Sequence, residues 1–164
     1  MKFSKTIKGK VWKFGDDVNT DVMFPPSYFS LNPDKIRQGL MKGIRYGFTK
    51  KIKPGDIIVG GKNFGCGSSR EIYAKAFKLN GISTVIAESF ARIFFRNMIN
   101  NGILLLECEG IAEYVNDGDV IEVSLNDYRI KNLNNGKILQ AKYLNKVVMN
   151  ILEAGGLIEK LKGE

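Results

Sequence analysis

A glycine-rich segment followed by two serines and an arginine holds the residues that could carry chemistry. Residues 60–67 include four glycines, and Ser68, Ser69 and Arg70 follow directly. Glycines let a ligand approach the backbone closely, and free N–H groups at a helix start favour an anion. Two hydroxyls and a guanidinium add donors and a positive charge suited to a carboxylate or a phosphate. The segment therefore indicates an anion site, although a tight strand-to-helix turn with serine caps would have the same composition.

Two familiar phosphate-binding templates do not fit this segment. A dinucleotide-binding fingerprint would need a glycine where Arg70 stands. A P-loop would need Lys and then Ser or Thr where Cys66 and Gly67 stand. The segment therefore matches neither nucleotide-binding template, and only its general suitability for an anion remains.

The residue types that are missing narrow the chemistry further. The chain has no histidine and two cysteines, Cys66 and Cys108. The lack of histidine excludes Ser-His-Asp and Cys-His pairs and every zinc site that needs imidazole. Two cysteines cannot hold an iron–sulfur cluster alone, because such clusters ordinarily take four thiolates, so no metal site is expected on this chain. An enzyme of this composition works by other means or supplies only part of an active site.

Composition and charge are those of a soluble globular domain. Of the 164 residues, 44% are hydrophobic and 26% are charged, which is enough to bury a core. The net charge of +8 comes from lysines spread along the chain without a dense block, and we interpret most of it as solvated surface. No apolar run could span a membrane and no signal peptide is present, so we expect a cytoplasmic protein with reduced thiols.

Alternating strand and helix patterns predict a parallel sheet. Apolar runs bounded by turn signals predict strands at residues 7–14, 57–59, 84–87 and 103–107. Helical spacing predicts one helix ending at Asn80 and a second opening at Ser89. Ser68 and Glu71 have the spacing of a capping box, which would place the serines at the N-terminus of the first helix. Strand–helix–strand–helix–strand at these lengths implies right-handed crossovers and a parallel core.

The flanking regions have a different pattern. Residues 120–125, 128–133 and 137–142 alternate between apolar and polar, and Asn134, Asn135 and Gly136 are a hairpin signal between the last two strands. Residues 146–154 predict a helix, and residues 19–33, with three prolines, predict a long loop. We therefore expect a single α/β domain covering residues 1–164, with a mostly parallel core sheet flanked by helices and an added antiparallel portion.

Residues 63–71, Asn-Phe-Gly-Cys-Gly-Ser-Ser-Arg-Glu, carry a resemblance to a known family. They are similar to the signature of the small, swivelling domain of the aconitase superfamily, and in particular of the small subunits of 3-isopropylmalate dehydratases. Residues 17–21, 87–97 and 100–103 agree in the right order. Relatives usually carry histidine at the position of Ile72, so whatever that imidazole does is not done here. The resemblance implies a single swivelling domain of β/β/α type.

The resemblance also implies an activity that needs a partner. In this family a large subunit holds a [4Fe–4S] cluster through three cysteines, and the small subunit covers it. The chain would then interconvert 2-isopropylmalate and 3-isopropylmalate by dehydration and rehydration in leucine biosynthesis, as a hydro-lyase active only with its large subunit. Ser68 resembles the residue that removes and returns the carbon-bound proton, stabilised by Arg70 and the helix start. Ser69 and Arg70 resemble the residues that bind the substrate's carboxylate. Cys66 and Cys108 are then packed thiols, not cluster ligands.

The segment after the prolines bears on the substrate's variable arm. In relatives, the segment resembling Tyr28, Phe29, Ser30 and Leu31 reaches over that arm, and an arginine two residues after the tyrosine goes with a third carboxylate. Here that position is Ser30 and its neighbour is Leu31, so we expect an alkyl-substituted malate. A homoaconitase small subunit or a dehydratase of another methylated malate is the alternative within the family. A basic nucleic-acid-binding module is the alternative outside it, disfavoured because no aromatic-interleaved basic stripe is present.

Overall fold

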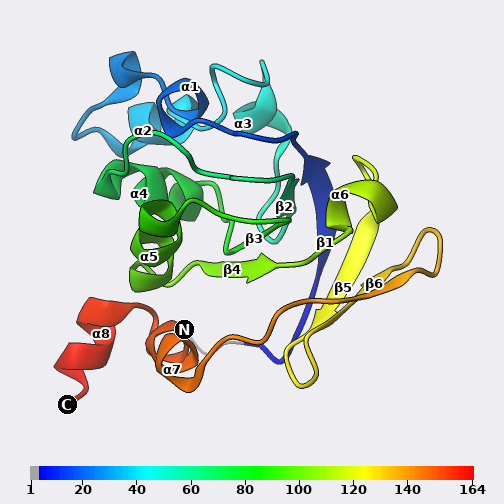
Figure 1. The fold of residues 1–164 in the computed structure, drawn as a ribbon. Coiled ribbons are helices and arrows are strands. Elements are labelled where there is room, and N and C mark those ends of the chain that lie inside the picture. Colours follow the sequence, from blue (N-terminus) through cyan, green and yellow to red (C-terminus); the bar gives the residue numbers. More distant parts are fainter. Residues whose placement is uncertain (1–3) are drawn as a thin grey trace.

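The computed structural model describes residues 4–164, and in that part of the chain one seven-stranded sheet runs through the molecule (Figure 1). The strand order is β4-β3-β2-β1-β5-β6-β7. The strands are β1 (Thr6–Lys13), β2 (Ile57–Gly60), β3 (Thr84–Ala87), β4 (Leu104–Glu107), β5 (Val120–Ser124), β6 (Arg129–Asn132) and β7 (Ile138–Gln140).

Four strands, β1 to β4, form the parallel half that the sequence predicts. β1 pairs with β2, β2 with β3 and β3 with β4, all in parallel. Strands β2 and β3 are buried along their whole length, because helices cover the sheet and leave no polar face. This burial explains why the strands are continuous apolar runs such as Ile57-Ile58-Val59 instead of alternating patterns.

Strand β1 is shared between the two halves of the sheet. Its last residues, 11–13, pair with β2, whereas residues 6–10 pair in antiparallel fashion with β5. Strands β5, β6 and β7 then continue as an antiparallel meander, which confirms the added antiparallel portion. The predicted hairpin joins β6 to β7, with Gly136 in the left-handed region at φ 75°.

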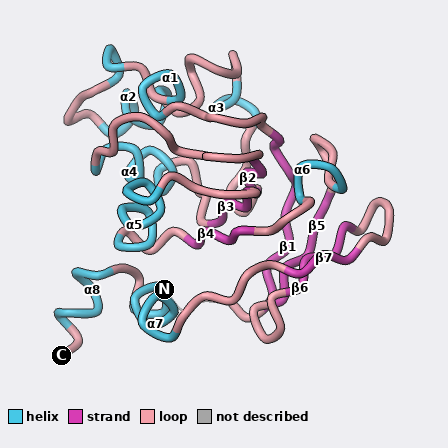
Figure 2. Tube along the Cα trace, viewed as in Figure 1, coloured by secondary structure: helices cyan, strands magenta, loops and turns pink. Residues whose placement is uncertain are grey.

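The helices gather mainly beside the parallel half, as Figures 1 and 2 show. α2 packs against α4, α5 packs against α7 and α8, and α6 lies against β2 and β3. The helices are α1 (Thr20–Met23), the 3₁₀ turn η1 (Pro26–Tyr28), α2 (Pro33–Gly39), α3 (Phe48–Lys51), α4 (Glu71–Leu79), α5 (Arg92–Asn100), α6 (Ile111–Tyr114), α7 (Lys146–Ala154) and α8 (Leu157–Lys162). No helix among residues 4–164 is long and apolar enough to cross a membrane.

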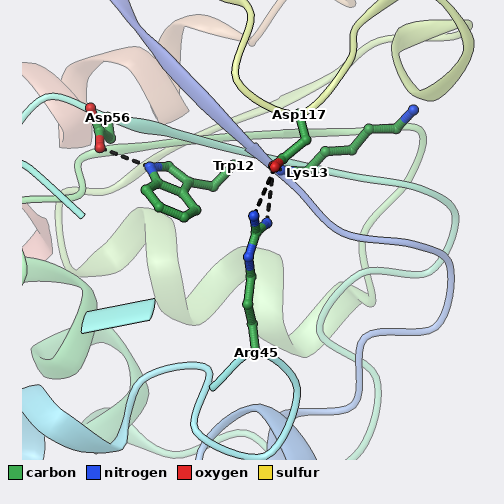
Figure 3. A network of polar contacts seen from close by, with 5 residues as sticks. All are labelled: Trp12, Lys13, Arg45, Asp56 and Asp117. Atoms are coloured by element: carbon green, nitrogen blue, oxygen red, sulfur yellow. Dashed lines mark hydrogen bonds and ion pairs between the residues drawn. The ribbon is translucent and has the colours of Figure 1, made fainter. Parts of the chain in front are cut away.

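A polar network fastens the segment between α2 and α3 to the end of β1 (Figure 3). Two guanidinium nitrogens of Arg45 donate to the two carboxylate oxygens of Asp117, at 2.9 and 2.7 Å. Asp117 also accepts from the backbone N–H of Lys13, and the Arg45 guanidinium lies 4.7 Å from the ring centroid of Trp12. The indole N–H of Trp12 donates to Asp56 at 2.8 Å. These bonds join four separate segments of the chain.

The prediction of a capping box at the start of α4 is wrong. The helix begins at Glu71 and its N-cap is Arg70, which is extended (φ −137°, ψ 149°) and makes no side-chain cap bond. The Ser68 hydroxyl instead donates to Asp21 of α1. A tertiary partner therefore takes the hydroxyl that local spacing assigned to the helix.

Two other predicted boundaries differ from the structure. α5 begins at Arg92 and not at Ser89, because the Ser89 hydroxyl accepts a hydrogen bond from the backbone of Asn63. Residues 19–33 are not one long loop: they contain α1, η1 and the first residue of α2. Asn19 and Asn32 cap the two α-helices by accepting bonds from the backbone two residues on, a cap pattern that the prolines obscured.

Candidate functional site

The candidate site lies on the loop of residues 61–70, which connects the carboxyl end of β2 to α4. Ligands of parallel α/β sheets commonly bind at these carboxyl ends. The backbone of this loop is bonded to the segment that follows β1: Gly65 donates to the carbonyl of Val18, and Thr20 donates to the carbonyl of Cys66, at 2.9 and 2.8 Å. The first turn of α1 is thereby held against the loop, so residues about fifty positions apart share one site.

Two glycines give the loop its path. Gly65 and Gly67 have φ values of 86° and 95°, in the left-handed region that other residues enter at a cost. A Cβ on Gly65 would overlap Phe94, which is fully buried, and one on Gly67 would lie 2.7 Å from Oδ1 of Asn19. The glycines predicted to let a ligand approach the backbone therefore serve close packing first, and they bring Ser68 over α1.

Ser68 belongs to a cluster of three polar side chains from three different elements. Its Oγ donates to Oδ1 of Asp21 at 2.6 Å. The Tyr73 hydroxyl donates to the same oxygen at 3.1 Å and lies 3.3 Å from Ser68 Oγ. The Thr20 hydroxyl donates to the carbonyl of Ser68 and fixes the backbone of that residue. Loop, α1 and α4 each contribute one functional group to the cluster.

Asp21 carries the negative charge of the cluster. The hydrogen bond from Ser68 lowers the pKa of this carboxyl below its ordinary value; desolvation opposes the shift, and Tyr73 and the positive charge of Arg70 add to it. The carboxylate is therefore ionised at neutral pH. The Tyr73 ring is fully buried against Phe24 and Phe29, so its hydroxyl has a fixed position beside the carboxylate.

Ser69 and Arg70 are oriented by α5 and by the segment after the prolines. The Asn97 side chain donates both to Ser69 Oγ, at 3.2 Å, and to the carbonyl of Arg70, at 3.1 Å. The Arg70 guanidinium lies 5.2 Å from the ring centroid of Phe29, a cation–π contact. Ser68, Arg70 and Asp21 are all exposed. The Ser68 hydroxyl, the Arg70 guanidinium and the Asp21 carboxylate are therefore accessible from solvent.

The other residues predicted to meet the substrate's arm lie on a neighbouring surface. Ser30 and Leu31 line a shallow groove together with Ile72 of α4, and Leu31 is 96% exposed. The Tyr28 ring instead lies beside Lys42, whose Nζ is 5.8 Å from the ring centroid. The structure thus brings Phe29 to Arg70 and Ser30 and Leu31 to Ile72, whereas Tyr28 faces another part of the surface.

Three residues of this site had no role predicted from the sequence. Asp21 and Tyr73 bind Ser68, and Asn97 binds Ser69. Asp21 lies in the family-like stretch 17–21 and Asn97 in the stretch 87–97, so the resemblance contained a signal for both. Tyr73 had no such signal in the sequence, because an aromatic residue at helical spacing predicts only a core position. The Tyr73 ring does lie in the core.

The donor set of residues 4–164 does not fit an iron–sulfur cluster. Among residues 4–164, no three His, Cys, Asp or Glu side chains are grouped so that they could hold a metal ion. Cys66 is half-buried and Cys108 is buried. Burial, with a smaller contribution from Glu88, raises the pKa of the Cys108 thiol to about 11, which disfavours the thiolate that a metal needs.

Comparison with known proteins agrees with this geometry. Residues 39–110, which include the loop and Ser68, match the aconitase C-terminal domain family. The chain is 56% identical over 157 residues to the isopropylmalate/citramalate isomerase small subunit of Methanocaldococcus jannaschii, covering 95% of this chain and 94% of that protein. It is 48% identical to the 3-isopropylmalate dehydratase small subunit of Halothermothrix orenii, covering 96% of both chains.

A solved structure gives the same result for the fold. The crystal structure of a 3-isopropylmalate dehydratase from Methanocaldococcus jannaschii matches with a TM-score of 0.91 and 43% sequence identity, over 96% of this chain and 94% of that one. The sequence and the fold therefore agree over nearly the full length, including the expected α/β class. This chain belongs to the aconitase superfamily, within the family of 3-isopropylmalate dehydratase small subunits.

Proposed function

We propose that this chain, acting over residues 1–164 as one lid domain, is the small subunit of a hydro-lyase that interconverts 2-isopropylmalate and 3-isopropylmalate. The observation that carries the proposal is the exposed Ser68 hydroxyl, held by Asp21 and flanked by Arg70. The names of relatives that match over nearly the whole chain support it.

A small subunit of a two-subunit dehydratase implies a large-subunit partner. We assign the [4Fe–4S] cluster to that partner, because the cysteines and carboxylates in the described part of this chain are not grouped to hold one. When bound, the cluster supplies a Lewis acid for the substrate's hydroxyl group. The exposure of Ser68 and Arg70 agrees with this division, since the large subunit would cover the face and exclude water from it.

Within this chain the reaction is divided between a proton-transfer group and anion binders. Ser68 removes a proton from the substrate's carbon and returns it after the hydroxyl has moved. Arg70 binds a substrate carboxylate as a fixed cation, and Ser69 adds a hydroxyl donor. The Phe29 ring beneath the guanidinium and the Asn97 amide beside Ser69 limit the motion of both groups.

The surface groove near the site favours an alkyl arm. Leu31 and Ile72 are apolar. By the family resemblance, Ser30 takes the position of the arginine that goes with a third carboxylate. One relative is named for both isopropylmalate and citramalate, which agrees with an apolar arm of variable size. Lys75 and Lys78 line the same groove and are the observation that favours the alternative, a tricarboxylate such as homocitrate.

The test is an activity assay of the chain reconstituted with its large subunit. We expect kcat/KM for isopropylmalate to exceed that for homocitrate by about a hundredfold or more, because a third carboxylate would lose its water against Leu31 and Ile72 with no arginine beside it, and the lysines of the groove are exposed to solvent. A preference for homocitrate would overturn the alkyl-arm argument. Ser68→Ala should abolish turnover while the two subunits still associate. The matched control is Ser83→Ala, which precedes the amino end of β3, whereas the site loop follows the carboxyl end of the parallel strand β2; this variant should retain full activity.

A further inference from the structure

The contact between Ser68 and Asp21 bears on how a serine can act as a base. A serine hydroxyl has its own proton, and it cannot accept another until that proton leaves. The atom at 2.6 Å from Ser68 Oγ is Oδ1 of Asp21, and the hydroxyl already donates to it. A short hydrogen bond between two oxygens is the geometry in which a proton moves from one to the other.

The negative charge of Asp21 also favours transfer of the Ser68 hydroxyl proton to this carboxylate over its loss to solvent. If Ser68 lost its proton to solvent, the alkoxide would lie at hydrogen-bond distance from an ionised carboxylate, and the two negative charges would repel each other. If the proton moves to Asp21, only one negative charge is present at any moment. The groups that act on Asp21 are Ser68 and Arg70 from the loop and Tyr73 from α4, and together they keep it ionised. A carboxylate with a lowered pKa does not take the hydroxyl proton unaided, so the transfer has to occur together with the arrival of the substrate's proton on Ser68.

We propose that Asp21 is a positioning residue that receives the hydroxyl proton of Ser68 while Ser68 takes a proton from the substrate, and that Tyr73 holds Asp21 for this transfer. The inference rests on the proposed function, because it assigns the group that makes Ser68 a base. Ile72 has no titratable group, so the proton route does not pass through that position.

The step balances in protons and electrons. The substrate C–H bond breaks and its proton forms a new O–H bond on Ser68, while the original O–H bond of Ser68 breaks and its proton binds Oδ1 of Asp21. The C–H electron pair becomes the second bond of the alkene as the substrate's hydroxyl leaves with its bonding pair, which the Lewis acid assigned to the large subunit would accept. The Asp21 carboxylate gains one proton and becomes a neutral carboxylic acid. Rehydration runs the same transfers in reverse.

Tyr73 keeps the acceptor oxygen in place. Its hydroxyl donates to the same Oδ1 that accepts from Ser68, and its fully buried ring cannot move away. The Tyr73 hydroxyl lies 3.3 Å from Ser68 Oγ. When Asp21 is protonated, this hydroxyl can donate to Ser68 Oγ instead of to Asp21. Tyr73→Phe would remove these hydrogen bonds and keep the ring packing against Phe24 and Phe29.

Asp21→Asn in the reconstituted two-subunit enzyme tests the proton route, with 2-isopropylmalate and citramalate as substrates. The amide oxygen still accepts the Ser68 hydrogen bond but cannot take its proton. We expect kcat at neutral pH to fall by about 10²–10⁴-fold, with KM changed less than about threefold. The residual kcat should rise about tenfold per pH unit, because Ser68 must now lose its proton to hydroxide. The unmodified enzyme should lack this rise, because its acceptor is already ionised.

Conservative variants and controls separate proton transfer from a structural role. Asp21→Glu keeps a carboxylate and should restore the weak pH dependence at a reduced kcat. Tyr73→Phe should lower kcat by about tenfold to a hundredfold with KM little changed, the effect of losing a hydrogen bond to a charged group. Asp34→Asn and Tyr46→Phe, at exposed positions, should behave as the unmodified enzyme. Unfolding curves of each variant report folding independently, and the Tyr73→Phe result still decides if Asp21→Asn does not fold.

The outcomes distinguish this inference from the proposed function. If Ser68→Ala is inactive but Asp21→Asn is nearly as active as the unmodified enzyme and has no steep pH dependence, Asp21 is not the proton acceptor and the inference is overturned. If Asp21→Asn does not fold and Tyr73→Phe keeps full kcat, the inference is equally overturned. If Ser68→Ala itself keeps most of the activity, the proposed function of Ser68 fails first.

Discussion

Substitution of Gly65 by alanine tests how the backbone of the site loop is held. Gly65 has a φ of 86°, and an L-residue in this region costs about 1–2 kcal/mol. Its added Cβ would lie 2.7 Å from Phe94 Cβ and closer still to the ring, in a core that cannot yield freely, and such overpacking costs about 1–3 kcal/mol. We therefore expect Gly65→Ala to lower the free energy of unfolding by about 2–5 kcal/mol.

Three other glycines separate these two causes. Gly15 has ordinary φ and nothing within 4 Å of its added Cβ, so Gly15→Ala should change stability by less than about 1 kcal/mol. Gly47 has a φ of 78°, and its added Cβ would meet nothing within 4 Å, so Gly47→Ala isolates the backbone cost of about 1–2 kcal/mol. Gly60 has ordinary φ but its added Cβ would lie 2.9 Å from Phe64 Cε2 and nearer to another ring atom, which isolates the packing cost.

Urea unfolding of the four alanine variants measures the free energies, and the kcat of the reconstituted enzyme measures the position of Ser68. Gly65→Ala should be the most destabilised variant and should also lose activity, because a misplacement of about 1 Å can cost about a hundredfold in rate. If Gly65→Ala costs no more than Gly47→Ala, the contact with Phe94 does not hold the loop and the reasoning is refuted.

Three further predictions follow from other contacts. Arg45 lowers the pKa of Asp117 by hydrogen bonding, so this pair stabilises the fold above the ordinary aspartate pKa, and the contribution is lost as pH falls through the lowered value. Asp117→Asn should remove this loss of stability at acid pH from urea unfolding curves, at a cost of about 0.2–1 kcal/mol because solvent screens the half-exposed pair. Cys108, with a pKa of about 11 and no exposed area, should resist iodoacetamide in the folded chain and react once urea unfolds it, as mass spectrometry of the labelled peptide would show. Asn97→Ala should raise KM about tenfold with a smaller change in kcat, because Asn97 orients the predicted carboxylate binder Ser69; an unchanged KM would contradict this role.

The fold class could be read from local patterns because burial on both faces leaves a clear signature. Buried strands such as β2 and β3 are short continuous apolar runs, and the intervening helices repeat their apolar residues at helical spacing. The hairpin between β6 and β7 was equally readable from Asn135 and Gly136, because few residues tolerate such a turn. Element boundaries were less certain where side chains had partners elsewhere in the molecule, as at Ser68 and Ser89.

Sequence alone determined which residue types stand at the site: a serine pair and an arginine after a glycine-rich loop, in a chain without histidine. Tertiary structure alone decided what Ser68 touches. Asp21 and Tyr73 are 47 residues before and 5 residues after it, and only the pairing of the loop with the segment after β1 brings the carboxylate within 2.6 Å. Local spacing assigned that hydroxyl to a helix cap, because spacing describes neighbours along the chain, whereas a hydrogen bond depends on distance in space.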